Sequence, residues 1–168
     1  MKSIVFDIRN YDTNVPMDDY DIICVEEIQN KYDTVACSFV TADVVDRIRL
    51  HRVKIKFEWL DSATNLTVDN FLFVQESNML FFNSPYQWGV IDIANKILKR
   101  REDAFYLPTI YRYEKFILVH DELYAESVKY NGERIDNVPI DPPYEMKEYE
   151  DRIEYNSPVY GHHILKTC

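Results

Sequence analysis

The sequence predicts an α+β fold that is mainly antiparallel β, built from hairpins and meanders, with two helices and an extended C-terminal arm. Three observations support this fold class. The chain holds 13 Tyr and 9 Phe but only 3 Gly, and Tyr and Phe favour strands. Several segments alternate apolar with polar residues, as half-buried strands do, whereas two others carry helix signals. A chain of 168 residues, 46% of them hydrophobic, is long enough to bury a core of its own.

The N-terminal part is predicted to form a strand followed by a hairpin. Over residues 3–9 the apolar residues alternate with others, as in a strand with one buried face. The apolar segments 22–28 and 34–40 flank a polar segment at 30–33, which has the composition of a turn. We therefore expect these two apolar segments to pair with each other.

Two helices are predicted, and the second has the stronger signals. Thr41 can cap a short helix over residues 42–50. In the second helix, over residues 84–101, Ser84 stands at the cap, Pro85 at the first helical position, and a Gln completes the capping box. Cations near the end of a helix suit the negative end of its dipole. The last turns of this predicted helix carry the basic residues Lys96, Lys99, Arg100 and Arg101.

The other predicted elements are strands. Residues 53–59 show the clearest alternation of apolar and polar residues, and the apolar segments 66–74 and 79–82 follow as a meander. Further along the chain, Asn131-Gly132 is the strongest short-range signal for a hairpin. These segments account for the β-rich part of the predicted fold.

The chain is predicted to consist of one domain over residues 1–140 and an acidic arm over residues 141–168. The arm holds six acids, three bases, three Pro and four Tyr, a composition that gains little by folding alone. Tyrosine is an effective interface residue because its rigid ring buries a large area at little cost in rotamer entropy. The residues predicted to contact a partner protein are the tyrosines of the arm and the basic residues of the second helix: Tyr144, Tyr149, Tyr155, Tyr160, Lys96, Lys99, Arg100 and Arg101.

The charge and the cysteines limit the expected partners and compartment. A formal net charge of −10 opposes binding to nucleic-acid phosphates and to anionic membranes, so neither is an expected partner. The N-terminal residues do not form an apolar leader, which predicts synthesis in the cytoplasm without secretion. The three cysteines have no metal-like spacing, and Cys24 and Cys37 lie in apolar segments where we expect them to be buried.

The sequence shows no catalytic, cofactor-binding or metal-binding signature, and we expect no enzymatic activity. Three widely separated glycines cannot build a phosphate-binding loop. Asp7 follows an apolar strand, but Arg9 stands where haloacid-dehalogenase-type phosphatases need a second Asp. His120-Asp121 is similar to the paired metal ligands of HD-type phosphohydrolases, but neighbouring residues of a strand point to opposite faces and cannot bind one ion. No motif of a known family is matched.

These observations favour a non-catalytic interaction protein or a structural subunit of a larger assembly, such as a neck or tail-ring component of a viral or phage particle. Two alternatives stay open. A small acidic inhibitor of the immunity-protein type would mask a basic, nucleic-acid-binding surface, if the acids of residues 12–33 or 121–154 converge on one face. An enzyme with a site assembled from distant residues would show a deep pocket with clustered ionisable groups.

Overall fold

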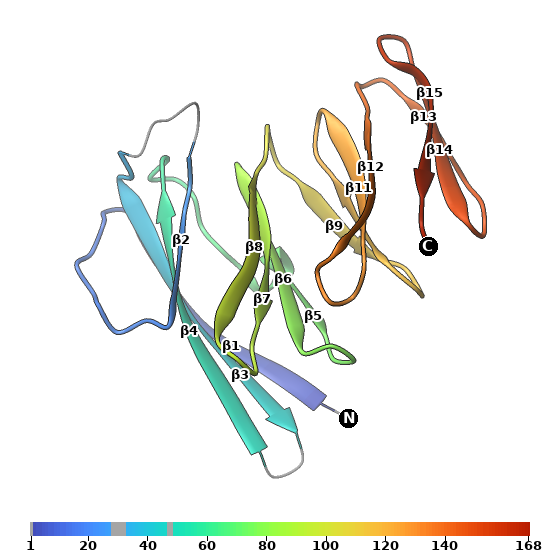
Figure 1. Ribbon diagram of the computed structural model, residues 1–168. Coiled ribbons are helices and arrows are strands. Elements are labelled where there is room, and N and C mark those ends of the chain that lie inside the picture. The colour runs from blue at the N-terminus through green and yellow to red at the C-terminus, as the bar shows by residue number, and fades with distance from the viewer. Residues whose placement is uncertain (1, 28–32, 47–48) are drawn as a thin grey trace.

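In the computed structural model, which describes residues 2–27, 33–46 and 49–168, the chain is built almost wholly of β-strands. The described residues form fifteen strands and one short 3-10 helix, and the strands make four sheets that follow one another along the chain. The sheets pack face to face in a row, with the first at one end and the last at the other (Figure 1). The predicted α+β class is therefore wrong, whereas the prediction of a β-rich chain is confirmed.

The first sheet has the longest strands of the molecule. Its order is β1-β3-β4-β2, with β2 parallel to β4 and the other pairs antiparallel. Its strands are β1 (Lys2–Tyr11), β2 (Ile22–Val25), β3 (Ala36–Asp46) and β4 (Arg49–Trp59). The predicted hairpin between 22–28 and 34–40 is wrong, because β2 pairs with β4 and not with β3. The apolar alternation of β2 predicts which face of the strand is buried, but not which strand lies beside it. The turn predicted at 30–33 falls mostly on residues 28–32, which lie outside the described residues.

The first predicted helix, over 42–50, is replaced by parts of β3 and β4. Ala42 and Val44, two residues apart in β3, are buried, whereas the next residue, Val45, is 40% exposed. The period of burial is therefore two, as β-branched residues favour. Residues 47–48 of the predicted helix lie outside the described residues.

The second sheet replaces the stronger predicted helix, over 84–101. The sheet has the order β5-β6-β7-β8 and follows the 3-10 helix η1 (Val68–Asn70). Its strands are β5 (Phe71–Val74), β6 (Met79–Ser84), β7 (Gln87–Asp92) and β8 (Ile97–Asp103). Both faces of β7 are buried, so its apolar residues form an unbroken run whose spacing also fits a helix. The basic residues at 99–101 lie in β8 rather than in a last helical turn.

Gly89, in the middle of β7, shows why this segment is a strand. A Cβ atom at this position would lie 2.6 Å from the carbonyl oxygen of Arg100 and 2.6 Å from the ring of Phe82. The chain turns back after Asp92, whose carboxylate accepts a hydrogen bond from the backbone N–H of Asn95 at 3.1 Å. The glycine thus serves close packing within the sheet, and in a helix interior it would be unfavourable.

The third and fourth sheets complete the row. The third has the order β12-β11-β10-β9, and the fourth is a three-stranded sheet of order β13-β14-β15. Their strands are β9 (Thr109–Arg112), β10 (Ile117–His120), β11 (Tyr124–Val128), β12 (Arg134–Pro139), β13 (Glu145–Glu148), β14 (Arg152–Ser157) and β15 (Gly161–Lys166). Asn131-Gly132 lies in the turn between β11 and β12, and Gly132 has a φ of 91° there. The hairpin predicted at this dipeptide is confirmed.

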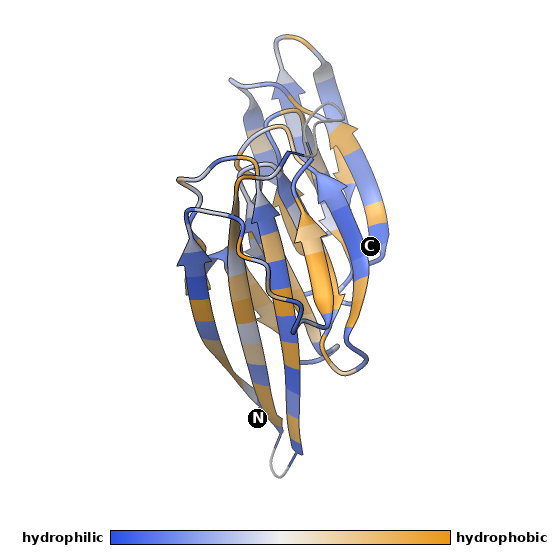
Figure 2. Cartoon of the chain, turned by 90° about the vertical axis from the view of Figure 1, so that its left-hand side faces the viewer, coloured by the Kyte–Doolittle hydropathy of each residue, from blue (hydrophilic) through white to orange (hydrophobic). Residues whose placement is uncertain are grey.

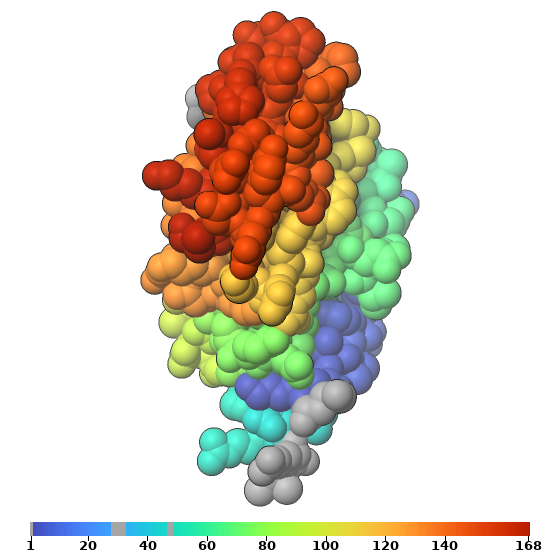
Figure 3. All heavy atoms as spheres, turned by 90° about the vertical axis from the view of Figure 1, so that its right-hand side faces the viewer, coloured from blue at the N-terminus to red at the C-terminus, as the bar shows by residue number. Residues whose placement is uncertain are grey.

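The predicted extended C-terminal arm is wrong, because β13–β15 form a sheet that covers the end of the row (Figure 3). Ile153, Tyr155 and Leu165 point inward from this sheet and are buried. Their neighbours Arg152, Glu154 and Lys166 are more exposed. The alternation is that of a strand with one buried face, although the high polar content of the segment hides it.

Three hydrophobic cores lie between successive sheets, and the inner sheets contribute to a core on each face. In β6, Leu80 faces the first core and Phe81 the second. In β10, Ile117 faces the second core and Leu118 the third. The alternating bands of hydropathy along the strands in Figure 2 reflect this arrangement.

Two further predictions can be compared with the structure. Cys24 and Cys37 are both fully buried, as predicted. Burial raises the pKa of the Cys24 thiol to about 12, with an opposing influence from Arg101. In the described part of the chain, no helix has the length and apolar character needed to cross a membrane.

Candidate interaction surface

Three consecutive large apolar side chains project from the connection between the second and third sheets. Phe105 is 60% exposed, and Tyr106 and Leu107 are each 51% exposed. We call these three residues the apolar loop. Single exposed apolar residues are common on protein surfaces, whereas these three consecutive residues form a small contiguous apolar patch.

The backbone of the apolar loop is held by a buried carboxylate. Asp121, only 5% exposed, follows β10 and accepts hydrogen bonds from the backbone N–H of Phe105 at 2.7 Å and of Tyr106 at 3.2 Å. The backbone N–H of Leu107 donates to the carbonyl oxygen of Pro85 at 2.7 Å. Bonds from N–H groups to an ionised carboxylate are among the stronger hydrogen bonds in proteins. The loop is therefore fixed to two different sheets.

The conformation of the loop is itself unusual. Leu107 has a φ of 44°, in the left-handed region that costs a non-glycine residue on the order of 1 kcal/mol. Next to it, the side-chain amide of Asn83 donates to the carbonyl oxygen of Pro108 at 2.6 Å. The surrounding hydrogen bonds hold this strained backbone in place, and strain of this kind is concentrated at functional sites.

Two hollows lie near the apolar loop along the chain: residues 109–111 line one, and Leu107 lines the other. One, of about 400 Å³, is lined by residues of η1, β5 and β9, including Phe71 and Tyr111. The other, of about 270 Å³, lies between the connection at 61–66 and the β6–β7 turn and has Leu107 in its wall. Asn70 and Asn83 line both hollows. The projecting side chains thus stand beside concave surface, an arrangement that suits interlocking with another polypeptide.

The tyrosines predicted as interface residues fall into two groups. Tyr155 is 1% exposed and belongs to the third core. Its hydroxyl is hydrogen-bonded to Nε2 of His120, and Tyr144 packs edge-on against both rings at centroid distances of 5.6 and 6.0 Å. Burial lowers the pKa of His120 to about 4, against an opposing influence of Glu148. Tyr155 and Tyr144 therefore attach the last sheet to the third sheet.

The other two predicted tyrosines lie nearer the surface. Tyr149 and Tyr160 are each 45% exposed. The guanidinium of Arg152 lies 4.3 Å from the centre of the Tyr149 ring, a cation–π contact within the last sheet. Both tyrosines retain enough exposed ring to contact a partner, and this role stays a prediction.

The predicted basic residues are also divided. Lys96 forms an ion pair with Asp21 at 2.9 Å, and Lys99 is exposed. Arg100 and Arg101 are partly buried and point in opposite directions from β8. They pair within the chain as follows: Arg100 with Glu102 and Glu126, and Arg101 with Gln87 and Asp103.

Arg100 also lies over the ring of Trp88, 4.7 Å from its centre. Its partner Glu126 is 1% exposed and is bound at 3.0 Å by Arg134 of the neighbouring strand as well. A buried carboxylate needs such partners because desolvation of an unpaired charge is costly. The Arg100 guanidinium therefore has a structural task between the second and third sheets.

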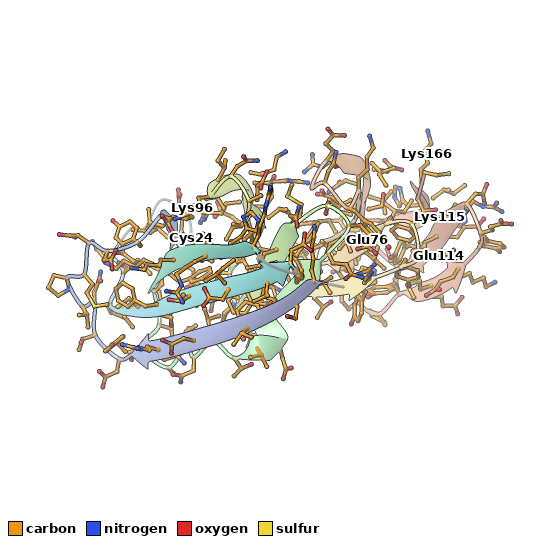
Figure 4. All side chains as sticks on the ribbon, turned by 90° about the horizontal axis from the view of Figure 1, so that it is seen from below. Cys24, Glu76, Lys96, Glu114, Lys115 and Lys166 are labelled. Carbon is orange, nitrogen blue, oxygen red and sulfur yellow. The ribbon has the colours of Figure 1, made fainter. Side chains whose placement is uncertain are left out.

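An acidic groove of about 380 Å³ lies between the third and fourth sheets. Four acids line it: Glu114, Glu148, Glu150 and Asp151. Tyr113, also in its wall, donates a hydrogen bond to Glu148 at 2.7 Å, and burial raises the pKa of this tyrosine to about 12. Glu114 lies beside Lys115 at this end of the molecule (Figure 4).

His120 and Asp121 point to different places, as expected for neighbours in or next to a strand. The imidazole of His120 lies in the tyrosine cluster, and the carboxylate of Asp121 holds the apolar loop. Among the described residues, no group of three or more His, Cys, Asp or Glu side chains could hold a metal ion.

The apolar loop was not among the elements or sites predicted from the sequence. A signal was present. Three large apolar residues directly before a proline, with no polar residue between them, do not fit the alternation of a half-buried strand. The role of Asp121 could not be found in the same way, because it depends on a contact across 16 residues of sequence.

Comparisons with known proteins give only a distant likeness. No protein-family model matches the sequence, and no curated protein matches it significantly. A solved structure of Hsv2 from Kluyveromyces marxianus is 13% identical, covers 77% of this chain and 44% of its own, and has a TM-score of 0.37. Hsv2 from Kluyveromyces lactis is 15% identical, covers 77% of this chain and 42% of its own, and has a TM-score of 0.40. The chain spans less than half the length of these structures, and no property of Hsv2 is carried over.

Proposed function

We propose that this chain is a non-catalytic interaction protein or a structural subunit of a larger assembly, and that the apolar loop is the centre of its contact with another protein. The observation that carries this proposal is the display of Phe105, Tyr106 and Leu107 on a backbone held by Asp121 and Pro85. Exposed apolar side chains are costly in water, and an ordered backbone keeps them from folding back onto the surface.

The physical argument is one of preorganisation. A partner that covers the loop gains the burial of two aromatic rings and a leucine, the kind of anchors that dominate interfaces. Because the backbone is already fixed by hydrogen bonds, little conformational entropy is lost on binding. The two hollows beside the loop supply concave surface for side chains of the partner. The partner chemistry that fits is an apolar groove with side chains that enter these hollows.

The finer form of the proposal is a subunit of a viral or phage particle, such as a neck or tail ring, made in the cytoplasm and carried in the particle. The four sheets form a row (Figure 1), and the apolar loop projects between the second and the third. Such a row offers neighbouring subunits a surface along its whole length. Membranes and nucleic acid are not among the proposed partners, since the net charge of −10 opposes both.

The double substitution Phe105→Ser/Tyr106→Ser tests the apolar loop. We expect it to weaken partner binding about tenfold or more, because two central anchors are lost. The measurement is quantitative mass spectrometry of proteins co-purified with the chain from its own cells, followed by calorimetric titration with the purified partner. Both side chains are mostly exposed, so the midpoint of urea unfolding is expected to stay close to the wild-type value.

The matched control is Ile97→Ser/Val159→Ser, which removes two apolar side chains that are 54% and 66% exposed elsewhere on the surface. This control is expected to bind the partner as the wild type does. Equal binding by all three proteins would show that the apolar loop is not the contact surface.

The acidic inhibitor is a second candidate, and the acidic groove favours it. Three of its acids, Glu148, Glu150 and Asp151, come from the segment 121–154, and Glu114 joins them. Substitution of Glu150 and Asp151 by Asn or Gln is expected to weaken binding to a basic partner in a salt-dependent manner. Binding that is insensitive to both the substitutions and the salt would exclude this candidate.

A further inference from the structure

The first sheet has an open edge that differs from every other sheet edge in the described residues. β1 spans ten residues and pairs with β3 along its whole length without a bulge. The other edge strands, namely β2, β5, β8, β9, β12, β13 and β15, have between four and seven residues. In the part of the chain that the structure describes, no backbone hydrogen bond joins β1 to any segment other than β3. β1 runs along one margin of the molecule (Figure 4).

The inward side chains of β1 are not fully covered by the rest of the chain. Ile4, Phe6 and Ile8 point toward the first core but are only partly buried. Phe6 stacks on Phe71 of the second sheet at a centroid distance of 4.9 Å. These three apolar residues pack against the core on one side and remain accessible on the other. A long, regular edge with apolar residues is a template for pairing with another strand, and short edges are one way to avoid it.

The order of the inward residues selects a second copy of this chain as the added strand. The sequence Ile4-Val5-Phe6-Asp7-Ile8 has the inward pattern Ile-Phe-Ile, which reads the same in both directions. Two-fold symmetric interfaces require such self-complementarity. In an antiparallel pair centred on Phe6, Ile4 lies opposite Ile8 of the second copy and Phe6 lies opposite its own counterpart.

Other registers fit less well. Centring on Asp7 sets two carboxylates opposite each other. Centring on Val5 sets Ile8 opposite Lys2. Centring on Ile8 sets Phe6 opposite Asn10, whose side chain is already engaged with the backbone of Leu66 at 3.0 Å. Registers shifted by one residue from these place inward side chains of one strand opposite outward side chains of the other.

The charge of the strand permits this approach. The chain as a whole carries −10, but β1 holds two bases, Lys2 and Arg9, and one acid. That acid, Asp7, is already paired with Arg9 at 3.0 Å. Two copies therefore meet through a segment that lacks the excess of acids found in the chain as a whole, which lessens the electrostatic repulsion along this edge.

We infer that two copies of the chain pair antiparallel through β1, centred on Phe6, and form one continuous eight-stranded sheet. The contact uses a different surface from the apolar loop and does not depend on it. Cross-strand apolar pairs and the backbone ladder stabilise the dimer, and the outward residues Val5 and Asp7 of opposite copies face each other.

The test uses Val5, which is 62% exposed and therefore tolerates substitution. Val5→Asp places a carboxylate opposite Asp7 of the other copy, twice per dimer, and is expected to raise the dimer dissociation constant about tenfold. Val5→Lys places an ammonium there and is expected to lower the dissociation constant severalfold. The measurement is sedimentation equilibrium over a concentration series, in which the wild-type mass rises from 20.1 kDa toward twice this value.

The matched control is Val159→Asp, a change of the same kind at a position 66% exposed in the turn between β14 and β15. It is expected to dimerise as the wild type does, and so is the apolar-loop variant Phe105→Ser/Tyr106→Ser. A wild-type chain that stays monomeric at every concentration overturns the inference, and so do equal effects of Val5→Asp and Val5→Lys. Loss of the dimer in the loop variant would assign self-association to the apolar loop instead.

Discussion

The core between the first and second sheets and the core between the third and fourth sheets differ in size and in chemistry. Among the described residues, the first core has 15 buried hydrophobic residues and the third has 8. In the first, the ring of Phe57 packs against the rings of Trp59 and Phe82. The third contains a polar group, the imidazole of His120, between two tyrosines. The two ends of the row are therefore held by different forces.

This difference indicates that stability is unevenly distributed along the chain. Burial of apolar area is the dominant favourable contribution to folding, so the end with the larger core is expected to be the more stable. The last sheet is smaller and depends on ring packing and hydrogen bonds to an adjacent sheet. Regions with fewer buried apolar contacts open at lower free energy than the rest of a protein.

The largest expected effect is at Phe57, which is fully buried in the first core. Phe57→Ala is expected to lower the free energy of unfolding by about 3–5 kcal/mol, because it removes a ring and leaves a cavity. Urea unfolding followed by far-UV circular dichroism measures this change. The exposed position Val68, 57% exposed, supplies the control, since Val68→Ala is expected to have little effect.

A smaller and more local effect is expected at Leu165, which is fully buried in the third core. Leu165→Ala is expected to destabilise the last sheet by about 2–3 kcal/mol. Hydrogen exchange should then show faster exchange in β13–β15, whereas β3 and β4 keep their protection. Equally accelerated exchange in all four sheets would show that the row unfolds as one unit and would remove the proposed difference between its ends.

The third prediction concerns pH and separates the two cores by chemistry. His120 has a pKa lowered from 6.5 to about 4 by burial. Between these values the unfolded chain binds a proton that the folded chain does not, so this group stabilises the fold fully above pH 6.5 and loses its contribution as the pH falls toward 4. The size of this loss is on the order of 3 kcal/mol.

His120→Gln is expected to remove this part of the pH dependence. Unfolding free energies of the wild type and the variant, measured by urea titration at several pH values, should converge as the pH falls. The variant isolates His120 from the other titrating groups because their contributions are common to both proteins. Parallel pH profiles would contradict the assigned role of His120.

Sequence reasoning succeeded where a segment is half-buried and local. The alternation in β1 and β4 and the turn at Asn131-Gly132 were read correctly, because the period of two and the conformational preference of glycine are properties of short segments. Burial of Cys24 and Cys37 was also found. The strand β7 was not predicted, because a strand buried on both faces shows no alternation of apolar and polar residues. Its continuous apolar segment fits a helix equally well.

The candidate site was less accessible to sequence reasoning than the fold. Of the predicted interface residues, Tyr155 and Arg100 make their contacts within the chain, in the third core and with Glu126. Tyr149 and Tyr160 are exposed, and their role stays a prediction. The apolar loop owes its fixed conformation to Pro85, in the β6–β7 turn, and to Asp121, which follows β10.

The sequence by itself determined that the chain is rich in strands, which residues of many strands face inward, and that its surface is acidic. These features follow from composition and from short-range periodicity. The tertiary structure alone decided which strands are neighbours, that the polar last segment folds as a sheet, and that Phe105, Tyr106 and Leu107 are held outward. The reason is that strand pairing and loop anchoring are contacts between residues distant in sequence, and their free energies do not appear in any local pattern.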